Sequence, residues 1–261
     1  MNIIVFQMNI IAGEPARNRE KVKAWFHRNV NHGVDIVMLP EMWTTAYALE
    51  RLKDLAEPAD GPSVTFLKEL ATDYDVHIIG GSIAVKEDDN IYNRAIVIDR
   101  KGRIVYEYDK IHLVPMLDEP KYLSGGRHKV QAFELDGIKM GIIICYDLRF
   151  PEIIRDLALQ GIQVLFIPAE WPEARAAHWE TLSTARAIEN QMYVVSCNRI
   201  GSYNGTTFAG RSMFIEPFGG VLSKGTADKE EVLQNTLDLE SVKRVREEVP
   251  IFKSRVPDLY K

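Results

Sequence analysis

The sequence predicts a layered sheet protein of the α/β or α+β class. Short apolar runs typical of buried strands alternate with stretches of helical periodicity along the whole chain. Of the 261 residues 46% are hydrophobic, and no repeat, low-complexity segment or linker interrupts the pattern. We therefore expect one domain over residues 1–261 with a large apolar core.

The first part of the chain starts with an apolar run, 3–10, that we expect to be a strand. A helix should follow, because Pro15 suits a first helical turn, apolar residues recur at helical spacing from Val22, and Gly33 suits a left-handed cap. Further strands are expected at 35–40, 77–85, 95–99 and 104–108, with a helix around 67–74 and a hairpin turn at Lys101-Gly102.

A long irregular segment, 111–128, then interrupts the regular pattern. It contains Pro115, Pro120 and the pair Gly125-Gly126, and loops of this length in compact domains are often functional. Beyond it we expect a turn at Asp136-Gly137, strands at 138–145, 164–168 and 193–198, a strand pair around Gly219-Gly220, and helices after 151, at 177–191 and at 239–247.

Charge and cysteine content narrow the function classes. Thirty-two Lys and Arg against 37 Asp and Glu give a net charge of -5, which provides no electrostatic basis for binding nucleic acid or an anionic membrane. No stretch approaches the roughly 18 apolar residues of a membrane span, and no basic leader starts the chain. The two cysteines form no disulfide framework. We expect a cytoplasmic protein with a small-molecule partner.

Three predicted strands each lead directly to a reactive side chain: Glu41, Lys110 and Cys145. Catalytic groups in layered α/β proteins gather at the carboxyl ends of strands, so these three are candidates for one site. A thiol needs a nearby cation to become a reactive thiolate, and Lys110 can provide that charge. Glu41 can serve as general base and then general acid.

Considered separately, each of these residues is also compatible with a structural or solvent-exposed role. A cysteine is commonly a small buried hydrophobe, as we expect for Cys197, and a lone glutamate or lysine is commonly solvated. The sequence contains no Walker loop, complete GxGxxG, HExxH, zinc-ligand spacing or GxSxG elbow. Its histidines, including His112, His128 and His178, are scattered, which favours structural roles.

Three blocks occurring together resemble the nitrilase superfamily of carbon-nitrogen hydrolases: LPEMW, YDKIHL and GIIICYDLRFPE, in this order. Further agreement comes from MLDEPKYLSGG, AEWP, HWETLSTARAIENQMYVVSCNRIG and FAGRSMFIEPFGG, so the resemblance spans nearly the whole chain. It implies a four-layer αββα sandwich, a homodimer, and an amidase that uses neither a metal nor an organic cofactor.

The resemblance also implies roles for individual residues. Cys145 corresponds to the nucleophile, Glu41 to the general base and acid, and Lys110 to the oxyanion stabiliser. Glu119 matches a second family glutamate that holds the lysine, and the backbone N–H of Tyr146 is expected to be the other oxyanion donor. Such an enzyme divides amide hydrolysis into two easier steps through a thioester.

Within the superfamily the chain looks most like the ω-amidase branch, which hydrolyses the terminal amide of 2-oxoglutaramate or 2-oxosuccinamate. The carboxylate of such a substrate needs a cation, for which Arg175 or Arg211 is a candidate, whereas Arg149 is expected to be structural. Tyr47 and Trp171 are candidates for the pocket wall. The alternatives are a nitrilase, a carbamoylase or an aliphatic amidase with the same catalytic residues, and a catalytically silent binding protein.

Overall fold

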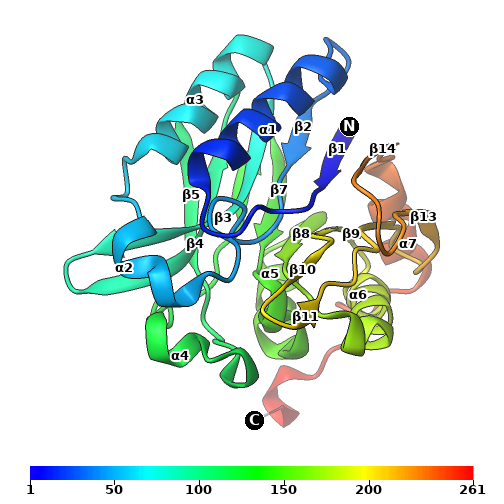
Figure 1. Cartoon of the computed structure of the whole chain (residues 1–261). Coiled ribbons are helices and arrows are strands. Elements are labelled where there is room, and N and C mark those ends of the chain that lie inside the picture. The colour runs from blue at the N-terminus through cyan, green and yellow to red at the C-terminus, as the bar shows by residue number, and fades with distance from the viewer. Residues whose placement is uncertain (261) are drawn as a thin grey trace.

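Two six-stranded mixed sheets pack against each other in the computed structural model, which describes residues 1–260 (Figure 1). The strands of the first sheet, in spatial order, are β14 (Glu231–Thr236), β1 (Asn2–Gln7), β2 (Ile36–Met38), β3 (His77–Glu87), β4 (Asn90–Ile98) and β5 (Ile104–Asp109). β1, β2 and β3 are parallel, and the remaining neighbours are antiparallel.

The second sheet repeats this design. Its strands, in spatial order, are β13 (Val221–Lys224), β12 (Met213–Ile215), β9 (Tyr193–Asn198), β8 (Val164–Ala169), β7 (Ile138–Ile142) and β6 (Phe133–Leu135). Here β7, β8 and β9 are parallel and the outer strands antiparallel. A short hairpin, β10 (Ser202–Tyr203) and β11 (Thr206–Thr207), lies outside both sheets.

Helices cover the outer face of each sheet (Figure 1). The α-helices are α1 (Pro15–Asn29), α2 (Leu52–Leu55), α3 (Pro62–Tyr74), α4 (Glu119–Tyr122), α5 (Pro151–Leu159), α6 (Ala176–Asn190) and α7 (Glu240–Glu248). The 3₁₀ helices are η1 (Leu49–Arg51), η2 (Pro115–Leu117), η3 (Cys145–Arg149), η4 (Glu173–Arg175) and η5 (Pro257–Leu259). Proline starts α1, α3 and α5, where its fixed φ and missing N–H carry no penalty.

The alternation of side chains along β1 shows why the layers stack in this order. Ile3 and Val5 point into the core shared with the second sheet, whereas Ile4 and Phe6 point to the core under α1 and α3. A strand buried on both faces is apolar at successive positions, which is the pattern of this segment. The result is a four-layer αββα sandwich, as the sequence predicted.

Most expected elements are confirmed, including the turns at Asp136-Gly137 and at Gly102, whose backbones have positive φ. The expected cap at Gly33 is wrong: α1 ends at Asn29 because Val30 is already extended. β14 was not anticipated, because it is an edge strand in which Leu233 is the only buried residue. No helix within residues 1–260 has the length and apolar character to cross a bilayer.

Candidate active site

Three of the predicted residues stand just beyond strands that belong to different sheets. Glu41 follows β2, Lys110 follows β5, and Cys145 follows β7. The first two come from one sheet and the third from the other, so the site lies at the carboxyl ends of strands where the two sheets meet. Glu119 joins them from the start of α4, within the irregular segment that the sequence singled out.

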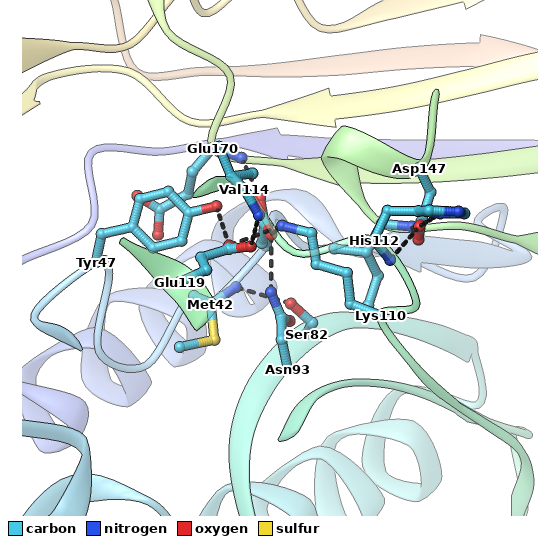
Figure 2. Close-up of polar contacts among 12 residues, drawn as sticks. Met42, Tyr47, Ser82, Asn93, Lys110, His112, Val114, Glu119, Asp147 and Glu170 are labelled. Atoms are coloured by element: carbon cyan, nitrogen blue, oxygen red, sulfur yellow. Dashed lines mark hydrogen bonds and ion pairs between the residues drawn. The ribbon is translucent and has the colours of Figure 1, made fainter. Parts of the chain in front are cut away.

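Lys110 contacts two carboxylates. Its Nζ is 2.8 Å from Oε1 of Glu41 and 2.8 Å from Oε1 of Glu119. Figure 2 shows Lys110 beside Glu119. All three side chains are fully buried. A buried ammonium is stable only with such partners, and the three groups together carry one net negative charge.

Other hydrogen bonds fix both carboxylates. Glu41 also accepts from Nδ2 of Asn93 at 2.8 Å and from the peptide N–H of Glu170 at 2.7 Å. Glu119 also accepts from the hydroxyl of Tyr47 at 2.7 Å and the peptide N–H of Val114 at 2.6 Å. Because these donors come from several elements, neither carboxylate can rotate without losing bonds.

Cys145 occupies a strained turn between β7 and η3. Its φ is 46°, in the left-handed region that costs a residue with a Cβ roughly 1–2 kcal/mol. Its side chain is 3% exposed and lines a small pocket. Strain of this kind is found where the fold holds a reactive group in a fixed direction.

Burial and charge set the protonation of the site. Burial, and then the charge of Glu41, raise the pKa of Cys145 well above its usual value, against the opposing effect of Lys110. Burial alone disfavours the ammonium, but Glu119 and Glu41 outweigh it and hold the pKa of Lys110 well above normal. Burial also raises the pKa of Glu119, with Lys110 opposing. These shifts favour a neutral thiol at Cys145 and a charged ammonium at Lys110.

The pocket beside Cys145 is narrow, with a volume of about 20 Å³, which is room for about one water molecule. Its wall consists of Val114, Met116, Leu117, Cys145, Tyr146, Arg149, Glu170, Trp171, Pro172 and Arg175. Two arginines, Arg149 and Arg175, thus line the same small space. No cluster of three or more His, Cys, Asp or Glu within residues 1–260 has the arrangement of a metal site.

The predicted pocket residues differ in their positions. Trp171 and Arg175 line the pocket, and the indole Nε1 of Trp171 donates to the backbone oxygen of Arg175 at 2.8 Å. Tyr47 is buried behind the pocket, against Glu119. Arg211 is not in this pocket wall: it pairs with Glu173 at 3.1 Å and with Glu180 at 3.2 Å. Because those carboxylates already balance its charge, Arg211 is not retained as a ligand of the substrate.

Arg149 also lies in the pocket wall, although the sequence favoured a structural role for it. It lines the pocket, its Cζ lies 4.6 Å from the ring centre of Trp171, and its Nε is buried without a hydrogen-bond partner among residues 1–260. Burial lowers its pKa, with a smaller contribution from the charge of Arg175. Its place four residues after Cys145, in the same turn, was the available signal.

Glu170 was also missed, although it follows the end of β8 as Glu41 follows β2. Its carboxylate is fully buried and pairs with Arg199 at 2.8 Å, while its peptide N–H holds Glu41. Burial raises the pKa of Glu170 to about 8, because Arg199 offsets only part of the desolvation. Glu170 thus links the carboxylate cluster to the end of β9.

Comparisons with known proteins agree with this geometry. A profile of the carbon-nitrogen hydrolase family matches residues 3–247. The chain is 40% identical over 262 residues to the "hydrolase in agr operon" of Staphylococcus aureus, covering 100% of both chains. It is 42% identical over 258 residues to the 2-oxoglutaramate amidase of Bacillus subtilis, covering 99% of this chain and 98% of the relative.

A solved structure shares the fold as well. It is a CN-hydrolase superfamily protein of Xanthomonas campestris with an arsenic adduct in its active site. The two structures superpose with a TM-score of 0.92 at 29% identity, over 98% of this chain and 97% of the other.

Proposed function

Because the chain belongs to the carbon-nitrogen hydrolase family and is an amidase, we propose that Cys145 is the nucleophile that attacks the amide carbonyl of a small substrate. The main support for this proposal is the position of Lys110. Its ammonium lies 2.8 Å from the carboxylates of Glu41 and Glu119, and the charges of these groups act on the Cys145 thiol. A buried cation beside a buried thiol and a carboxylate supplies the charges that acyl transfer to sulfur requires.

Acylation begins when Glu41 takes the thiol proton and the Cys145 sulfur bonds to the amide carbon. The carbonyl oxygen becomes an oxyanion, which Lys110 Nζ and the peptide N–H of Tyr146 stabilise. Glu41 then gives its proton to the nitrogen, the carbon–nitrogen bond breaks, and ammonia leaves, so that Cys145 carries a thioester. In the second step a water molecule gives a proton to Glu41 and its oxygen bonds to the thioester carbon. The carbon–sulfur bond then breaks, the acid leaves, and Glu41 returns the proton to the sulfur, which restores the thiol.

Glu119 acts through Lys110 in this scheme. Its carboxylate holds the ammonium at 2.8 Å, and the hydroxyl of Tyr47 and the N–H of Val114 hold the carboxylate. The lysine therefore keeps its charge and direction even while Glu41 is protonated in mid-reaction. Tyr47 belongs to this support and is not proposed to contact the substrate.

The side chains that line the pocket favour a substrate that carries a carboxylate, and the pocket must widen beyond its volume of about 20 Å³ to admit it. Arg149 and Arg175 both line it, and neither forms an ion pair with a carboxylate of residues 1–260. The unpartnered Nε of Arg149 adds a buried donor that an anionic ligand would satisfy. We therefore propose the ω-amide of a short 2-oxo dicarboxylic acid, 2-oxoglutaramate or 2-oxosuccinamate. The B. subtilis relative is named for the first of these.

We further propose that the chain acts as a single domain, as a homodimer and in the cytoplasm. Its first and last strands pair within one sheet, which supports a single folding unit. Ile188 on α6 and Phe218 expose apolar surface that a second copy can cover, at 50% and 53% exposure. Both cysteines are free, as a reducing compartment requires. Light scattering of the purified protein tests the dimer.

The substrate class is tested by measuring ammonia release. The panel contains 2-oxoglutaramate, 2-oxosuccinamate, an aliphatic nitrile and an N-carbamoyl amino acid, with pentanamide as the uncharged control of matched length. We expect kcat/KM for 2-oxoglutaramate to exceed that for pentanamide by about 10–100-fold, the size of a lost charge-assisted hydrogen bond. Equal kcat/KM values for the two amides would show that the substrate needs no carboxylate. A preference for the nitrile or the carbamoyl compound would assign the chain to that substrate class instead.

A further inference from the structure

Asp147 receives hydrogen bonds from both sides of the site. Its Oδ2 accepts from the Tyr108 hydroxyl at 2.7 Å and the Ile144 N–H at 3.1 Å. Its Oδ1 accepts from the peptide N–H of His112 at 3.1 Å and lies 2.8 Å from ring Nδ1 of His112 (Figure 2). Since an ionised carboxylate only accepts, Nδ1 of His112 is the donor.

These partners bracket the lysine and the cysteine. Tyr108 and His112 lie two residues before and two residues after Lys110, while Ile144 and Asp147 flank Cys145. One fully buried carboxylate therefore connects the segment that carries the ammonium with the turn that carries the thiol.

No strand pairing makes this connection. β5 is an edge of the first sheet and β6 is an edge of the second, and among residues 1–260 no named strand of one sheet pairs with a named strand of the other. Backbone pairing of their strands therefore does not align Lys110 with Cys145, whereas the hydrogen bonds of Asp147 connect the two segments. The left-handed backbone of Cys145 also needs support, and Asp147 supplies it by holding the Ile144 N–H just before the turn.

The His112 ring is fixed as well. It stacks on Phe150 with ring centres 3.5 Å apart and planes inclined by 8°. Phe150 in turn contacts the ring of Tyr146 edge-on, with centres 5.6 Å apart. The imidazole thus lies between the carboxylate of Asp147 and an aromatic pair at the proposed oxyanion donor.

We propose that His112 and Asp147 form a positioning pair that holds the Lys110 ammonium at the Cys145 sulfur. Neither residue touches the reacting atoms in the proposed mechanism. The inference rests on the proposed roles of Lys110 and Cys145 and assigns to the pair the alignment of the two. A displacement of about 1 Å between reacting groups can lower a rate about 100-fold, which sets the expected effect.

Two substitutions of His112 separate the hydrogen bond from the packing. His112→Phe keeps a flat ring on Phe150 and removes the Nδ1 donor, whereas His112→Asn keeps a donor near the Nδ1 position and removes the ring. We expect His112→Phe to lower kcat about 100-fold with KM within about threefold, and His112→Asn to restore most of kcat. Equal losses in both variants, wild-type kcat in His112→Phe, or a change confined to KM would each overturn the proposal.

Asp147→Asn is the second variant, and Asp99→Asn is its matched control. Asp99 is also buried and accepts from Lys101 N–H, Arg103 N–H and Arg103 Nε, but it lies in a hairpin away from the pocket. We expect both variants to unfold at lower temperature and only Asp147→Asn to lose kcat, by about 100-fold. If kcat falls equally in the two variants, the effect is one of stability and the positioning role is wrong.

Alkylation of Cys145 by iodoacetamide provides a readout independent of the substrate. We expect His112→Phe to slow it at least about threefold, because the thiolate loses the nearby cation, while buried Cys197 stays unmodified. An unchanged alkylation rate would contradict the positioning pair. If wild-type protein releases no ammonia from any amide but alkylation slows in His112→Phe, the proposed function fails and the pair stands.

Discussion

Cys145, just beyond β7, and Cys197, within the second sheet, are both buried, yet their surroundings differ. Cys197 lies within β9, and its Sγ is 3.4 Å from the backbone oxygen of Phe6. Burial raises the pKa of Cys197 well above normal, and no charged group contributes. Burial also raises the pKa of Cys145, but there Glu41 and Lys110 act on the thiol as well.

Burial acts alone on the Cys197 thiol and favours its neutral, unreactive form. In the proposed mechanism Cys145 differs because the carboxylate of Glu41 accepts its proton and the ammonium of Lys110 stabilises the charge that develops on the substrate. Desolvation favours the neutral thiol of Cys145, and neutral thiols are less easily oxidised than thiolates. The same low-polarity surroundings strengthen the electrostatic interactions among the charged groups once the reaction begins.

The largest expected effect separates the two cysteines directly. Cys145→Ala should lower kcat by roughly 10⁴–10⁶-fold, because the nucleophile of a covalent mechanism has no substitute. Cys197→Ala should keep kcat within about twofold and lower the free energy of unfolding by about 1 kcal/mol. Ammonia-release kinetics and urea unfolding measure both. Normal turnover in Cys145→Ala would end the assignment of the nucleophile.

Removing the cation should make Cys145 resemble Cys197. Lys110→Met should lower kcat about 10²–10³-fold through loss of an oxyanion donor. It should also lower the free energy of unfolding by about 3–5 kcal/mol, since Glu41 and Glu119 would be left buried without a counter-charge. Lys224→Met, which removes an exposed lysine paired with Glu180, is the control and should change neither quantity measurably.

The two cysteines also differ in their access to substrate. Cys145 lines a pocket together with two arginines, whereas Cys197 is not part of that pocket wall. Arg149→Met and Arg175→Met should each raise KM for 2-oxoglutaramate about 10–100-fold and leave KM for pentanamide nearly unchanged. Arg244→Met, at an exposed arginine paired with Asp238, serves as the control. An unchanged KM in both pocket variants would show that the substrate carboxylate binds elsewhere.

The smallest effect concerns the inert thiol and pH. In the unfolded chain the Cys197 thiol titrates near pH 8.5, whereas in the folded protein its pKa is raised by burial. The folded state therefore binds more protons above about pH 8.5, and the free energy of unfolding falls as pH rises through that window. Cys197→Ala should remove up to about 1.4 kcal/mol per pH unit from this slope. Identical slopes in urea unfolding between pH 8 and 10 would contradict it.

The layered fold, the family and the candidate residues at strand ends could be predicted from the sequence. These features depend on apolar periodicity and on residues adjacent to a strand. The family and the αββα architecture are confirmed. The contacts of Arg149 and Asp147 were not predictable in the same way. Hydrogen bonds such as that from Tyr108 to Asp147, which span 39 positions, leave no periodic pattern in a single sequence.

Arg211 and β14 are two further cases in which contacts between distant segments could not be predicted from the sequence. An arginine after a glycine gives no sign of whether its charge is balanced, and here Glu173 and Glu180 balance it. β14 has little apolar periodicity because Leu233 is its only buried residue. Its partner, β1, was recognisable from its own apolar run, but nothing in that run identified the strand beside it.

The pairing of β1 with β14, from Asn2 opposite Thr236 to Gln7 opposite Glu231, bears on how the protein is made. On the ribosome Glu41 and Lys110 emerge well before Cys145, and β1 lacks its β14 neighbour until residue 236 has left the exit tunnel. A partly synthesised chain therefore contains these side chains before their sheet is complete. Activity should appear late, with the closing of that edge.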